Sequence, residues 1–267
     1  MPLAKLEDIN IYYEVKDAKS GIPLVMVPGL GGDIMSFASA AGKLRKHIPV
    51  VLVENRGVGR SSVTEAPYST SQMAEDLLLL LDYLGYSKVN LLGHSMGGYI
   101  VQKLAARKPD KLNKLILSGT AACMSDANKT AFSKLYDDRA SGKITSREFY
   151  STMLKICIAP SFYNDDVFME AALAFMMNYP YQQSLPGLKG QLTACFNHNS
   201  LRDLKKIKNK TLVVTGELDE IGTVKDSEFL HESIAKSELC VIDGMAHLPC
   251  MEKPDLYVKC ILDFLSG

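Results

Sequence analysis

The sequence has no excess of charge of either sign. Lys and Arg together number 30, and Asp and Glu also number 30, so the formal net charge is +0. A chain that binds nucleic acid or an anionic membrane through charge carries a basic excess. We therefore expect neither nucleic acid nor a membrane among its partners.

Long apolar segments are also missing. Five leucines at positions 77–81 are bounded by Asp76 and Asp82, and no segment approaches the ~20 apolar residues that cross a bilayer. The N-terminal sequence MPLAKLEDINIYYEV has no apolar stretch behind a basic region. We therefore expect no signal peptide.

The cysteines form no C-x-x-C pair and lie scattered along the chain, at Cys123, Cys157, Cys195, Cys240, Cys250 and Cys260. In a long chain without a secretion signal, such cysteines are typical of buried thiols in a reducing compartment. We therefore predict free thiols and a cytoplasmic protein.

Signatures of bound metals and cofactors are missing as well. No His or Cys cluster has metal-ligand spacing, no G-x-G-x-x-G opens the first helix, and no Walker loop is present. We expect neither a metal nor a cofactor.

Short apolar runs alternate with amphipathic stretches. Of the 267 residues, 47% are hydrophobic, enough for one large α/β domain with an insertion. The runs predict an edge strand at 9–15 and buried parallel strands at 24–27, 50–53, 89–92, 115–117, 211–214 and 239–242. Helices are predicted at 71–84, 97–108, 223–235 and 255–265. This alternation indicates a mostly parallel sheet flanked by helices.

The alternation stops between residues 123 and 206. This stretch shows helical periodicity without a clear strand and is rich in Met, Phe and Tyr. We interpret it as a helical cap, residues 123–206, inserted into a core domain of residues 1–122 and 207–267. Most of its apolar side chains would form a small core, and a few would line a substrate pocket.

The segment 93–97 reads G-x-S-x-G between a predicted strand and a predicted helix. In that context the motif places a serine in a strained turn with its hydroxyl exposed at the end of the sheet. We predict Ser95 as a nucleophile, while Gly93 and Gly97 avoid backbone clashes. The alternative is an ordinary serine at the start of a helix.

Two backbone amides are candidates for an oxyanion hole. The Met96 amide follows the nucleophile at the start of the helix. The second donor should come from the loop after the third strand, 28–32, which reads PGLGG, and Leu30 is our candidate. The alternative for this loop is a glycine-rich turn without chemistry.

A nucleophilic serine needs a base, which in this arrangement follows it in the chain. The histidines are His47, His94, His198, His231 and His247. His47 precedes the serine, and His94 adjoins it. His198 lies in the predicted cap, and His231 lies in a predicted helix. His247, on a glycine-containing loop after the last strand, is therefore the candidate base.

The acid that orients the base should follow the preceding strand, where the loop reads TGELDEI. Asp219 is the first choice, and Glu217 and Glu220 remain alternatives. Geometry has to decide among the three carboxylates, because most acidic residues in such loops are simply solvated.

These segments resemble the α/β-hydrolase superfamily. The loop 28–32, the segment 55–62, the turn 93–98 and the segment 244–247 carry the resemblance, which extends over nearly the whole chain outside the cap. The superfamily usually has histidine at the position of Pro28 and commonly aspartate at that of Glu54. Neither difference removes a proposed catalytic group.

Within the superfamily, segments 93–98 and 117–122 are similar to 3-oxoadipate enol-lactonases and small carboxylesterases. Serine at position 95 argues against the dehalogenase and epoxide hydrolase branches, which use aspartate there. The resemblance implies hydrolysis of a small-molecule ester or lactone through an acyl-enzyme. Related branches cleave C–C bonds or thioesters, or catalyse perhydrolysis, with the same triad.

Two other classes of function stay open. A slow-turnover ligand receptor would keep the triad, whereas a catalytically inactive interaction module would often lose one of its members. A substrate with a carboxylate would need a cation in the cap, for which Arg139, Arg147 and Lys155 are candidates. The sequence leaves the substrate and the oligomeric state open.

Overall fold

An eight-stranded sheet organises the structure, a computed structural model that describes residues 2–16 and 20–267. The strand order is β1-β2-β4-β3-β5-β6-β7-β8. The β1–β2 and β2–β4 pairs are antiparallel, and all the others are parallel. The strands are β1 Leu3–Lys5, β2 Asn10–Lys16, β3 Leu24–Val27, β4 Val50–Val53, β5 Val89–His94, β6 Leu112–Ser118, β7 Lys210–Gly216 and β8 Ser237–Ile242.

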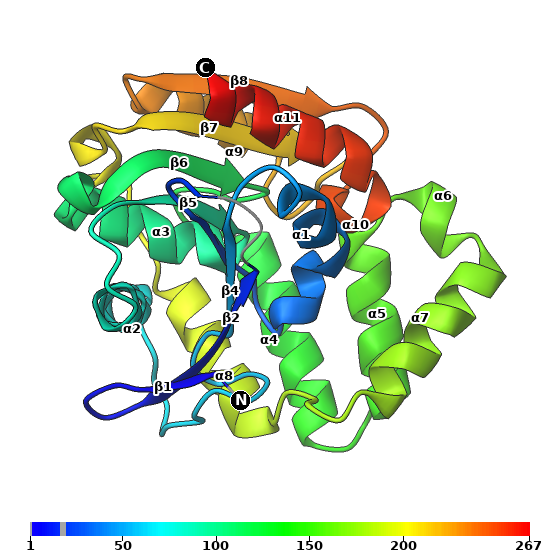
Figure 1. The fold of residues 1–267 in the computed structure, drawn as a ribbon. Helices are drawn as coiled ribbons and strands as arrows, with labels where there is room; N and C mark the ends of the chain where they lie inside the picture. The colour runs from blue at the N-terminus through cyan, green and yellow to red at the C-terminus, as the bar shows by residue number, and fades with distance from the viewer. Residues whose placement is uncertain (1, 17–19) are drawn as a thin grey trace.

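Helices cover both faces of this sheet (Figure 1). One face carries α2 Thr70–Tyr83, α3 Met96–Arg107 and α9 Val224–Ser233, and the other carries α1 Ala38–Leu44 and α11 Pro254–Ser266. Shorter helices are α10 Pro249–Glu252 and the 3-10 turns η1 Ile34–Phe37, η2 Pro109–Lys111 and η3 Leu204–Lys206.

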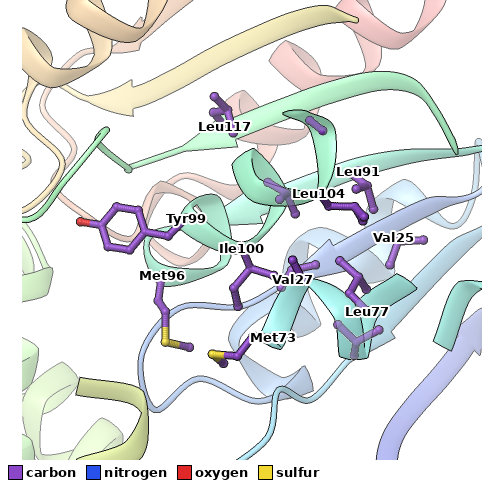
Figure 2. Close-up of a cluster of buried hydrophobic side chains, with 14 of the residues drawn as sticks. Val25, Val27, Met73, Leu77, Leu91, Met96, Tyr99, Ile100, Leu104 and Leu117 are labelled. Atoms are coloured by element: carbon purple, nitrogen blue, oxygen red, sulfur yellow. The ribbon is translucent and has the colours of Figure 1, made fainter. Parts of the chain in front are cut away.

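The central strands are buried on both sides, which explains their unbroken apolar runs. In β3, Val25 and Val27 face the core under α2 and α3, whereas Leu24 and Met26 face the core under α1 and α11. Successive side chains of a strand point to opposite faces, so a strand covered on both faces needs apolar residues throughout. Figure 2 shows part of the first core, where side chains of β3 and β5 meet those of α2 and α3.

Between β6 and β7 the chain forms an inserted helical region. Its helices are α4 Asp126–Ala140, α5 Ser146–Cys157, α6 Pro160–Tyr163, α7 Asp166–Asn178 and α8 Leu185–Phe196, here called the inserted helices. An isolated bridge pairs Cys123 with Asn199 at the base of the insertion. A small core of Leu154, Ile158, Met169 and Leu173 packs α5 against α7. In the described part of the chain, no helix has the length and hydropathy needed to cross a membrane.

The mostly parallel sheet, its flanking helices and the inserted helical region confirm the predicted fold class. Two details of the prediction are wrong. The strand predicted at the edge, now β2, lies between β1 and β4, because the three-residue strand β1 forms the edge. In addition, Cys240 of β8 and Cys260 of α11 form a disulfide where free thiols were expected. Cys123, Cys157, Cys195 and Cys250 are free.

Three histidines are buried in this fold, and two of them, His94 and His198, have strongly lowered pKa values. His198 stacks on Tyr99 with ring centroids 4.2 Å apart, and its Nδ1 lies 2.9 Å from Thr70 Oγ1. Burial lowers the pKa of both His94 and His198 to about 3. Each stays neutral in the folded chain at mildly acidic pH, whereas the unfolded chain takes up the proton near the ordinary value of about 6.5.

We therefore expect stability to fall as the pH drops from 7 to 5, because the unfolded state gains the protons. His94 and His198 should each contribute about 2 kcal/mol to this loss. Urea unfolding of the wild type and of His198→Asn at the two pH values measures it. The variant should show a smaller pH dependence, and the exposed-site control His47→Gln should match the wild type. Equal pH dependence in His198→Asn and the wild type would contradict the prediction.

Candidate active site

Ser95 lies in the tight turn between β5 and α3. Its backbone has φ 54° and ψ −119°, and Ser95 is the one non-glycine residue with positive φ among the described residues. A Cβ at Gly93 would lie 2.3 Å from Gly97 O, and one at Gly97 would lie 2.0 Å from Val27 O. The turn therefore exists only because both flanking positions lack side chains.

Asp219 and His247 meet at the ends of β7 and β8. His247 Nδ1 lies 2.8 Å from Asp219 Oδ2, and both residues are buried. Asp219 Oδ1 accepts hydrogen bonds from the amides of Ile221 and Gly222. Burial alone would raise the pKa of Asp219, but the charge of His247 and these hydrogen bonds hold it below its ordinary value. The pair can therefore fix the imidazole with Nδ1 protonated and Nε2 free.

The other acidic candidates do not contact the imidazole. Glu217 Oε2 accepts a hydrogen bond from Gly244 N at 2.8 Å, and the Glu220 side chain is exposed. Of the three carboxylates in the loop, the structure pairs Asp219 with His247.

The turn that carries Ser95 reaches this pair through His94. The ring of His94, the preceding residue, packs on that of His247 with centroids 4.8 Å apart. Within residues 2–16 and 20–267 no hydrogen bond joins Ser95 to His247. Such bonds are often long in unliganded enzymes and tighten with bound substrate.

The two candidate oxyanion donors come from segments adjacent to Ser95. Met96 is the first residue of α3, where a helix leaves its amide without an internal partner. The loop that carries Leu30 packs on the serine, because a Cβ at Gly29 would lie 2.9 Å from Ser95 Cβ. Neither amide has a hydrogen-bond partner in the described part of the chain.

Side chains outside the predicted site hold the oxyanion loop. Asn55 Nδ2 donates to Pro28 O at 3.0 Å, which fixes the loop at the residue where the resemblance leads one to expect histidine. Gln191 of α8, fully buried, accepts from Gly31 N at 2.9 Å and donates to Arg56 O at 2.8 Å. Nothing in the sequence distinguishes Gln191 from other polar residues of a helix.

Glu252 of α10 holds the loop that carries His247. Its carboxylate accepts hydrogen bonds from the amides of Ala246, Leu248 and Ala159 at 3.2, 3.1 and 3.0 Å. Only 8% of Glu252 is exposed. The amide of His247 itself donates to Cys157 O at the end of α5. The loop of His247 is thus tied both to the sheet domain and to the inserted helices, by contacts that the sequence did not indicate.

The described residues contain no group of three or more His, Cys, Asp or Glu side chains arranged to hold a metal ion.

A family model for the alpha/beta hydrolase fold matches residues 22–254. The chain belongs to this family. The eight-stranded sheet with its inserted helical region is the arrangement this family membership implies.

Individual relatives extend over nearly the whole chain. The chain is 26% identical to 3-oxoadipate enol-lactonase 2 of Acinetobacter baylyi, over 94% of this chain and 91% of that protein. It is 31% identical to a proline iminopeptidase of Pestalotiopsis fici, with coverages of 94% and 93%. The crystal structure of a thermophilic esterase from Thermogutta terrifontis matches with a TM-score of 0.83 and 25% identity, over 97% of this chain and 93% of that one.

Replacement of Glu252 tests whether its carboxylate holds the His247 loop. In Glu252→Gln, an NH₂ group replaces an oxygen that accepts an amide proton, so at least one buried amide loses its acceptor. We expect the free energy of unfolding to fall by about 1–3 kcal/mol. The matched control Glu220→Gln changes an exposed carboxylate and should have little effect. Equal stability of the two variants in urea unfolding would show that the contacts do not contribute.

Proposed function

We propose that the chain is a serine hydrolase that cleaves a carboxylic ester or lactone of a small organic acid. The observation that carries this proposal is the buried Asp219–His247 hydrogen bond beside the strained turn of Ser95. A base oriented by a carboxylate close to a serine hydroxyl is the arrangement that activates a nucleophile.

The reaction would proceed through an acyl-enzyme. His247 Nε2 takes the Ser95 proton as Oγ attacks the substrate carbonyl, while Asp219 stabilises the imidazolium. The amides of Leu30 and Met96 donate to the oxyanion that forms. The imidazolium then returns its proton to the departing alkoxide or enolate. Water attacks the acyl-enzyme with His247 again as base, and the free acid leaves.

The named relatives support an acyl-transfer reaction but do not determine which leaving group the substrate carries. Their names include an enol-lactonase, an esterase and an iminopeptidase, and reactions on esters, lactones and amides can share one triad. We favour the ester or lactone because the enol-lactonase and the esterase match along almost the entire chain. Cleavage of C–C bonds or thioesters, perhydrolysis and slow-turnover ligand reception are outcomes that substrate profiling distinguishes.

Hydrolysis of p-nitrophenyl esters from acetate to decanoate tests the proposal. The wild type should turn over repeatedly, and Ser95→Ala should lose at least ~10³-fold in kcat, as in serine hydrolases that lose their nucleophile. Ser141→Ala, which alters an exposed serine at the end of α4, should retain full activity.

Either of two results would count against the proposal. Full activity in Ser95→Ala would exclude Ser95 as the nucleophile. If the wild type hydrolysed no ester and no lactone, the ester or lactone function would be wrong. A single turnover with retained product would instead favour a ligand receptor on this scaffold.

A further inference from the structure

The inserted helices line a partly open cavity of about 170 Å³. Its walls come from the end of α4, the start of α5 and the start of α8 with the segment before it, and they include Phe149, Tyr150 and Leu188. Arg139 is the one charged side chain in the lining. The lining therefore mixes apolar and aromatic side chains with polar ones and carries a single cation, a composition suited to an organic anion.

Arg139 has no acidic partner in the described part of the chain. It donates to Ser146 Oγ at 2.6 Å, and no carboxylate lies within ion-pair distance of it. Its guanidinium retains further N–H donors, which suit a carboxylate in a two-bond arrangement. Arg139 is half-buried, and a pair formed there is less screened by water than one on the open surface.

The other cationic candidates of the sequence do not line the cavity. Arg147 forms an exposed ion pair with Glu170 at 2.6 Å, and Lys155 is exposed on α5. Geometry therefore selects Arg139 among the three.

Tyr150 supplies a second polar group in the same space. Its hydroxyl has no hydrogen-bond partner among residues 2–16 and 20–267. Burial raises the pKa of Tyr150, and the positive charge of Arg139 opposes that rise, which places the two groups within electrostatic reach of each other. A neutral phenol beside a guanidinium can donate a further hydrogen bond to an anion.

The cavity adjoins the oxyanion loop. Gln183 lines it and donates to Gln191 Oε1 at 2.9 Å, the atom that also accepts from Gly31 N. A Cβ at Gly31 would lie 3.2 Å from Gln183 Oε1. Gln183 therefore contacts both the cavity and the loop that carries Leu30.

We propose that Arg139 binds a free carboxylate of the substrate, so that the enzyme prefers an ester or lactone carrying a second acid group. The inference rests on the function proposed above, since it places the reacting carbonyl at Ser95 and the second carboxylate in the cavity among the inserted helices.

Matched pairs of esters test the proposal. The anionic members are the p-nitrophenyl half-esters of succinate, glutarate and adipate. Each neutral counterpart carries an isopropyl group in place of the free carboxylate. The wild type should prefer the anionic member of the best pair by about 10- to 100-fold in kcat/KM, the size expected for a hydrogen bond to a charged group.

In Arg139→Gln the ratio of the two kcat/KM values should fall toward one. Arg139→Lys keeps the positive charge but lacks the two-bond geometry of the guanidinium, so its ratio should lie between those of the wild type and Arg139→Gln. The matched control Arg147→Gln should keep the wild-type ratio. Circular dichroism and thermal unfolding check that each variant is folded. A wild-type ratio near one, or an unchanged ratio in Arg139→Gln, would overturn the proposal.

Failure of the proposed hydrolase function can be distinguished from failure of the proposed carboxylate site. If the wild type hydrolyses neither member of a pair, calorimetric titration with glutarate and adipate tests separately whether the cavity binds a carboxylate. Binding to the wild type that is lost in Arg139→Gln would support the carboxylate site without the reaction. No binding to the wild type would contradict it.

Discussion

The contact between α3 and β3 is the constraint on which the site depends. Gly97 packs so closely on Val27 that a Cβ there would lie 2.0 Å from its carbonyl oxygen. This approach forces the strand-to-helix turn to be tight and holds Ser95 at positive φ, with its hydroxyl at the end of the sheet. Because β5, β7 and β8 run parallel, the ends of β7 and β8 deliver Asp219 and His247 to the same edge.

The inserted helices contact the loops that carry the proposed site residues. Gln191 of α8 binds the oxyanion loop at Gly31, and Cys157 at the end of α5 accepts a hydrogen bond from the His247 amide. Glu252 joins the His247 loop to the same insertion through Ala159 N. A displacement of the insertion would therefore move the proposed oxyanion donor and the proposed base together. The geometry of the proposed site and the shape of the cavity of about 170 Å³ therefore both depend on the inserted helices.

Much of this arrangement was predictable, because it rests on local patterns. Continuous apolar runs located β3, β4 and β5, and G-x-S-x-G with chain order selected Ser95 and His247. What failed depends on contacts between distant segments. The strand β1 has three residues, too few to show a period, and the pairing of Cys240 with Cys260 has no local signal. The choice of Asp219 over its acidic neighbours, and the roles of Gln191 and Glu252, needed the folded geometry. The boundaries of the cap, 123–206, stay a prediction.

Covalent labelling tests the central claim, that Ser95 is an activated nucleophile, most directly. The folded chain would be treated with a fluorophosphonate, digested and analysed by mass spectrometry. The account predicts one phosphonyl adduct, on Ser95, that forms at neutral pH and is lost in Asp219→Asn and His247→Gln, because the hydroxyl then lacks its oriented base. An adduct on a different serine, or none in a chain that hydrolyses esters, would contradict it.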